Sequence, residues 1–184
     1  MILTGHEIEA ELMRGVIHID PFERQYLNPN SYNYRLAADL RICRDDVLDP
    51  TEPGNWATVR IPEEGFILRP HVLYLGSTIE RIGSFSYVPS LIGRSSLGRL
   101  GMFLQTSADL GNLGAIHSWT LEIKVVQKLR IYAGMIAGQV SFWRPAGDIH
   151  PYSGVYHKFS GATPSQRLGK HLIGVDDTNG SRDS

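Results

Sequence analysis

The sequence contains very little cysteine. Cys43 is the only cysteine among 184 residues, which excludes an intrachain disulfide. Zinc-dependent nucleobase deaminases bind their metal with the paired cysteines of a PCxxC element. One cysteine cannot form that element, so we expect no zinc site of this kind.

Long apolar runs and a net charge are also lacking. The chain has no stretch of about 18 apolar residues, and its start, MILTGHEIEAELMRG, lacks the charged-then-apolar pattern of a signal peptide. The 18 basic and 19 acidic side chains leave a formal net charge of -1, so no overall field attracts nucleic acid or anionic lipid. We expect a cytoplasmic protein with no nucleic-acid or membrane partner, in which any anion binding is local.

The hydrophobic pattern predicts an all-β protein with one short helix at its start. Thr4 and Glu7 form a capping box, Ile8 and Leu12 lie at helical spacing, and Gly15 ends the pattern. Short apolar or alternating runs follow, broken by proline, glycine and asparagine. They are VIHI, YNYRLAADLRI, FILRPHVLYLG, MFLQT, SWTLEIKVV, RIYAG and GQVSFW. Many short, closely spaced strands favour a closed or sandwiched antiparallel architecture, a jelly roll or related barrel.

Composition predicts a single domain over residues 1–166. DDVLDPTEPGNWATV, at 45–59, carries two prolines and a glycine among acids and is interpreted as a surface excursion between strands. Residues 167–184 are polar with few apolar anchors, which is typical of a mobile tail.

The run GRSSLGRLG, at 93–101, has the composition of a phosphate-binding loop. The guanidinium groups of Arg94 and Arg99 can form paired hydrogen bonds with phosphate oxygens. Ser95, Ser96 and backbone N–H groups beside glycine add further donors. The alternative is a turn with two solvated arginines and a serine-capped short helix.

Glu122 lies in SWTLEIKVV, at 118–126. Alternation along this strand places Trp119 and Leu121 on the apolar face and Glu122 on the other. Such a glutamate is ordinarily a solvated strand carboxylate. In a partly desolvated cleft, a raised pKa would let it move protons near neutral pH.

Weaker signals come from two further segments. Asp109 and Asn112 lie in a loop, 107–114, where they could accept hydrogen bonds from ligand hydroxyls or simply shape the turn. Gln139 follows two glycines on a predicted strand, where its amide could contact a nucleobase edge.

Taken together, these motifs resemble the dCTP deaminase branch of the dUTPase-like family. The resemblance covers residues 1 to about 166. It rests on GRSSLGRLG, on TLE at 120–122 with the expected spacing from Arg99, on AGMIAGQVSF at 133–142, on ATPSQ at 162–166, and on MILTGHEIEAEL followed by SYNYRLA at the start.

This resemblance implies a distorted jelly-roll subunit in a homotrimer whose active sites are shared between neighbouring chains. Magnesium would bind through the nucleotide phosphates and not through protein side chains, and dTTP would be a feedback ligand. The catalytic residues would be Glu122, Ser95 and Arg99. The implied substrate-binding residues are Arg94, Ser95, Ser96, Arg99, Ala108, Asn112, Thr120, Leu121, Gln139, Tyr152 and Tyr156.

The implied reaction is the metal-free hydrolytic deamination of a deoxycytidine nucleotide, dCTP by family default. Glu122 would take a proton from the water that attacks C4 of cytosine and pass it toward the leaving ammonia. Ser95 and Arg99 would place and polarise that water.

Three departures from the family pattern leave other functions open. Asn112 stands where the family usually has an aspartate, and an amide cannot act as a base. Ala115 and His117 replace a usual aromatic residue and a usual glycine. Val155 and Phe159 stand where a lysine and a glutamine usually contact the triphosphate.

The sequence therefore leaves three alternatives to dCTP deamination. The protein could be a dUTPase or a bifunctional deaminase and diphosphatase. Its substrate could be a mono-, di- or modified cytosine nucleotide, or the chain could be a catalytically altered nucleotide-binding regulator.

Overall fold

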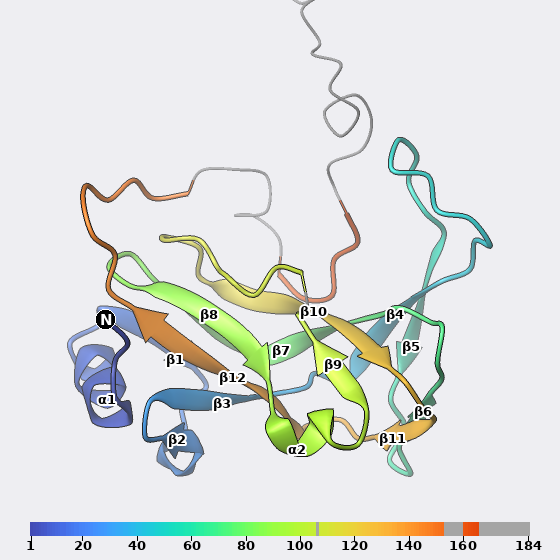
Figure 1. Cartoon of the computed structure of the whole chain (residues 1–184), viewed down its shortest axis with the longest axis horizontal. Coiled ribbons are helices and arrows are strands. Elements are labelled where there is room, and N and C mark those ends of the chain that lie inside the picture. Colours follow the sequence, from blue (N-terminus) through green and yellow to red (C-terminus); the bar gives the residue numbers. More distant parts are fainter. Residues whose placement is uncertain (106, 153–159, 166–184) are drawn as a thin grey trace, which may run out of the picture.

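Residues 1–105, 107–152 and 160–165 are described in a computed structural model of the chain (Figure 1). One short helix at the start of the chain is followed by a succession of strands, which confirms the all-β prediction. In order the elements are α1 (Gly5–Met13), β1 (Ile17–Asp20), the 3-10 helix η1 (Arg24–Tyr26), β2 (Leu27–Asn28), β3 (Ser31–Arg35), β4 (Asp39–Cys43), β5 (Trp56–Arg60), β6 (Phe66–Leu68), β7 (Tyr74–Ser84), β8 (Val88–Gly93), α2 (Ser95–Gly98), β9 (Met102–Leu104), β10 (His117–Val125), β11 (Leu129–Ile131) and β12 (Ile136–Trp143).

The strands form two main antiparallel sheets. Strands β5-β4-β7-β10-β9 form the larger sheet, in which β1 also pairs with β7, and β2-β3-β12-β8 form the smaller one. β6 and β11 pair separately. One apolar core takes side chains from both sheets, among them the fully buried Tyr32, Tyr34, Leu121 and Phe142. No helix in the described part of the chain is long and apolar enough to cross a membrane.

The N-terminal helix begins and ends where the sequence predicts. The Thr4 hydroxyl accepts a hydrogen bond from the backbone N–H of Glu7 at 3.3 Å, and Ile8 is fully buried. After the helix, Gly15 adopts φ 73, a left-handed conformation that a glycine reaches at no steric cost.

Several strand predictions are wrong in detail. YNYRLAADLRI, at 32–42, is divided between β3 and β4. FILRPHVLYLG forms parts of two strands, because Pro70 cannot donate to a ladder and His71 turns the chain at φ 63. The predicted excursion ends earlier than expected, since Trp56 already begins β5. The strand from Val88 to Gly93 was not predicted, because Pro89 interrupts the run and residues 89–91 are all buried, so the run lacks the alternation of a half-buried strand.

A bulge in β7 offsets its pairing with β10. The register passes from Ser118 opposite Arg81 to Thr120 opposite Ser77. The Thr78 hydroxyl bridges this irregularity, donating to the Glu80 carbonyl at 2.7 Å and accepting from the Trp119 N–H at 2.9 Å. The conformation of β7 therefore determines where this part of β10 lies.

A buried ion pair stabilises the bulge. The Glu80 side chain is fully buried and accepts from both Arg35 Nε at 2.7 Å and the Arg35 backbone N–H at 2.9 Å. Hydrogen bonding to Glu80 raises the pKa of Arg35 above its ordinary value. Arg35 also donates to Glu23 at 2.6 Å, so the guanidinium joins two carboxylates.

Replacing Glu80 should destabilise the fold. Glu80→Gln leaves one oxygen for two donors and turns an NH2 group toward a backbone N–H. We expect the free energy of unfolding to fall by about 3 kcal/mol in urea denaturation. The exposed Glu63→Gln is the matched control; equal stability of the two variants would contradict this role.

Candidate functional site

Strand β10 is held along both edges near its start. One edge pairs with β7, and β9 pairs with the other edge only at residues 123–125. Beside Ser118 and Thr120, the second edge is taken by the chain's own 160–163 segment. Gly161 N–H donates to the Ser118 carbonyl at 3.2 Å, and the Thr120 hydroxyl donates to the Gly161 carbonyl at 2.8 Å and accepts from Thr163 N–H at 3.1 Å.

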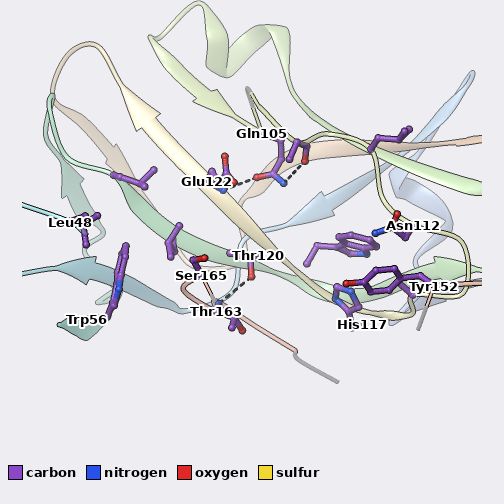
Figure 2. A pocket seen from close by; sticks show the side chains of 16 residues that line it. Leu48, Trp56, Gln105, Asn112, His117, Thr120, Glu122, Tyr152, Thr163 and Ser165 are labelled. Carbon is purple, nitrogen blue, oxygen red and sulfur yellow. Dashed lines mark hydrogen bonds between the residues drawn. The ribbon is translucent and has the colours of Figure 1, made fainter. Parts of the chain in front are cut away.

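A cavity of about 520 Å³ lies over this strand (Figure 2). Figure 2 shows His117 and Tyr152 at one end and Leu48 and Trp56 at the other, with Thr120 and Glu122 between them. The cavity is lined by Leu48, Trp56, Leu73, Leu75, Gln105, Ala108, Leu110, Asn112, Ala115, His117, Trp119, Thr120, Glu122, Tyr152, Thr163 and Ser165. A pocket of this size accommodates a small organic ligand.

Glu122 is the only carboxylate among the described residues that line the cavity. The alternation predicted for β10 holds at Leu121 and Ile123, which are fully buried while Glu122 is half-buried on the opposite face. It does not hold at Trp119, which was predicted on the apolar face but lines the same cavity as Glu122. A carboxylate in a largely apolar cavity can accept a proton from water and return it to a leaving group.

Gln105 holds Glu122 in place, although the sequence analysis did not single it out. Its side-chain oxygen accepts from the Glu122 backbone N–H at 2.7 Å, and its amide donates to the Ala108 carbonyl at 3.2 Å (Figure 2). Gln105 adopts φ 49, a left-handed conformation uncommon outside glycine. A glutamine just after an expected strand carries no sequence signal for this conformation.

The loop after Gln105 is fixed to β8. Leu91 N–H donates to the Asp109 carbonyl at 2.7 Å, and the Ser90 hydroxyl donates to the Asp109 carboxylate at 3.2 Å. Asp109 therefore shapes the loop, which is the second of the two roles that the sequence left open for this residue. Ala108 and Asn112 from the same loop do line the cavity.

The predicted phosphate-binding loop lies away from the Glu122 cavity of the same chain. Arg94 precedes α2, which contains Ser95 and Ser96, and Arg99 follows it. None of these four residues lines the cavity that contains Glu122. In Figure 1, α2 lies at the lower edge of the molecule, whereas residues 160–165 lie above β10. Within one chain, the predicted phosphate-binding residues at α2 and the Glu122 cavity thus lie at separate places.

The remaining sequence-predicted residues lie in four different places. Tyr152 lines the cavity, and its backbone N–H donates to the Leu113 carbonyl at 2.8 Å. The Leu121 side chain belongs to the core, which leaves only its backbone for a ligand. Gln139 lies in the smaller sheet and accepts from the Ser31 hydroxyl at 2.7 Å. Tyr156, with Val155 and Phe159, falls outside the described residues.

The Gln105 contact predicts a measurable change in stability. Gln105→Ala removes the partner of the Glu122 N–H, at a cost of about 1–3 kcal/mol, and also leaves a Cβ in the left-handed region. Gln105→Gly removes the same partner without the steric strain, so we expect it to be the more stable of the two in urea denaturation.

Gln25→Ala, which changes an exposed glutamine, should leave the free energy of unfolding within about 0.5 kcal/mol of the wild type. If both Gln105 variants match that control, the side chain does not hold the strand.

Comparisons with known proteins place the chain in one family. Residues 2–145 match the profile of the dCTP deaminase-like family. A "dCTP deaminase, dUMP-forming" from Leptospira biflexa is 46% identical over 166 residues, covering 90% of this chain and 95% of its own length. The protein of the same description from Clostridium acetobutylicum is 42% identical over the same shares.

A more distant solved structure shares the fold. The crystal structure of 2′-deoxycytidine 5′-triphosphate deaminase from Agrobacterium tumefaciens superposes with a TM-score of 0.61 at 19% identity. That match covers 77% of this chain and 47% of the other. On the profile match and the high identity to its bacterial relatives, the chain belongs to the dCTP deaminase-like family.

Proposed function

We propose that the protein deaminates dCTP hydrolytically at C4 of cytosine. The observation that supports this most directly is Glu122, which is the one carboxylate among the described lining residues of a nucleotide-sized cavity in a dCTP deaminase-like chain. The relatives from Leptospira biflexa and Clostridium acetobutylicum carry dCTP deaminase in their names.

The proposed chemistry needs one group that moves a proton twice. Glu122 takes a proton from water as the water oxygen forms a bond to C4. It then delivers a proton to the exocyclic amine as the C4–N bond breaks. Ammonia leaves, and the second proton of the water passes from the C4 oxygen to N3, so cytosine and water become uracil and ammonia. Gln105 keeps the strand carrying Glu122 in register with the loop at Ala108.

We further propose that a neighbouring chain supplies the phosphate-binding residues. Arg94, Ser95, Ser96 and Arg99 have the chemistry of a phosphate site but stand outside the cavity of their own chain. A homotrimer, as the family resemblance implies, would bring α2 of one chain to the Glu122 cavity of the next. In that arrangement Ser95 and Arg99 would also approach the attacking water.

Magnesium belongs to the substrate in this proposal. Phosphate oxygens and water are the ligands that Mg²⁺ prefers, so the ion would arrive with the triphosphate. Among residues 1–105, 107–152 and 160–165, no group of three or more His, Cys, Asp or Glu side chains is placed to hold a metal ion.

Further conversion to dUMP is the second candidate activity. The names of the two bacterial relatives, both dUMP-forming, favour it. Cleaving the triphosphate requires an activated water, and the amide of Asn112 in the cavity cannot accept its proton. Glu122 would then have to serve both steps.

Glu122→Gln tests the proton carrier. An amide preserves the shape of the side chain but cannot shuttle protons, so we expect ammonia release from dCTP to fall by about 10³-fold while dCTP binding is retained. Chromatography of the wild-type reaction separates dUTP from dUMP and so tests the second candidate as well. Glu63→Gln is the control, and near-normal turnover in Glu122→Gln would end the assignment.

Mixed oligomers test the shared site. Glu122→Gln and Arg99→Ala should each be inactive alone, yet a trimer that contains both has sites where an intact Glu122 meets an intact Arg99 from its neighbour. Random co-assembly in equal amounts should restore about a quarter of wild-type turnover, because each intact partner is present at half of the positions. Co-assembled trimers without activity would place both residues in the site of one chain.

A further inference from the structure

An aromatic pair forms one end of the Glu122 cavity. The rings of His117 and Trp119 lie with centroids 4.3 Å apart and planes tilted by 35°. Both residues line the cavity, as does Tyr152, which Figure 2 shows beside His117. Ring faces of this kind pack well against flat or apolar parts of a ligand.

The pair is held by contacts that fix both rings. Trp119 Nε1 donates to the Ile82 carbonyl at 2.9 Å, and His117 Nδ1 lies 3.1 Å from the Ser118 carbonyl, to which it can donate. The Trp119 ring fills the space over Gly111, where an added Cβ would lie 2.6 Å from Trp119 Cη2. A pair supported in this way is pre-organised for a ligand.

Position along β10 indicates which part of a nucleotide meets the pair. Trp119 and His117 precede Glu122 by three and five residues on β10, and Figure 2 shows Thr120 between Glu122 and His117. If C4 of cytosine faces Glu122, the base extends over Thr120 and the sugar reaches the aromatic pair. Asn112 lines the same end of the cavity, where it can bond a sugar hydroxyl.

We propose that His117, stacked on Trp119, forms the deoxyribose wall of the nucleotide site and selects deoxyribose over ribose. This inference rests on the proposed deamination of dCTP. A ring face accommodates the C2′ methylene of deoxyribose. A 2′-hydroxyl buried against the same face loses its hydrogen bonds to water without gaining a partner, so ribonucleotides bind more weakly. His117 is a specificity-determining residue, and the proton transfer remains with Glu122.

Equilibrium binding to the Glu122→Gln chain tests this without turnover. The dissociation constants of dCTP and CTP are measured by calorimetry with magnesium, with and without a second substitution at His117. His117→Ala should weaken dCTP binding about tenfold and change CTP binding by less than about threefold, so that the sugar preference largely disappears. His117→Phe keeps a ring face and should keep the preference. The exposed His150→Ala is the matched control.

Each other outcome contradicts the inference. Unchanged dCTP and CTP affinities in His117→Ala would show that the imidazole does not meet the sugar. A loss in His117→Phe as large as in His117→Ala would show that the imidazole nitrogens matter and the ring face does not. If thermal denaturation shows that His117→Ala is unfolded, His117→Asn supplies the truncation.

The outcomes distinguish a failure of the proposed function from a failure of this inference. A wild-type chain that binds dCTP over CTP but releases no ammonia would refute deamination and leave the deoxyribose wall intact. If the Glu122→Gln chain without a substitution at His117 binds neither dCTP nor CTP, both the proposed function and this inference are overturned.

Discussion

The pairing of β10 with β7 is the constraint on which the site depends. The bulge in β7 offsets the register between Ser118 and Thr120, and the Thr78 hydroxyl joins the two strands across it. The bulge in turn rests on the buried Glu80–Arg35 pair. This arrangement determines that Trp119 lies at one end of the cavity and that Glu122 points into its centre. The Glu80–Arg35 ion pair thus supports a site that neither residue lines.

Strand β10 also bears on our proposal that one chain does not complete the site. Beyond the β9 pairing, residues 160–163 occupy this edge of β10. The described residues that line the cavity above it include one carboxylate and several apolar and aromatic side chains. Nothing among the described lining residues carries a positive charge comparable to that of Arg94 and Arg99. A triphosphate needs such charge, and the α2 region of a neighbouring chain is the source that our proposal assigns.

The sequence predicted the elements that depend on local patterns. The Thr4 half of the predicted capping box and the alternation at residues 121–123 are found, because each reflects contacts within a few residues. The Glu7 carboxylate pairs with Arg14 instead of completing the box. Gln105 and the β7 bulge were missed, since a left-handed glutamine and a two-strand irregularity are determined by tertiary packing. Arg94 and Glu122 were identified by residue type, but their separation in one chain depends on how the two sheets are joined. The roles of both residues stay predictions.

The most direct test of the account is a crystal structure of the Glu122→Gln protein with magnesium and dCTP. The account predicts that C4 of cytosine faces residue 122 of one chain, and that Arg94 and Arg99 of a second chain contact the triphosphate. A triphosphate bound by the arginines of the same chain, or a base bound away from residue 122, would contradict it.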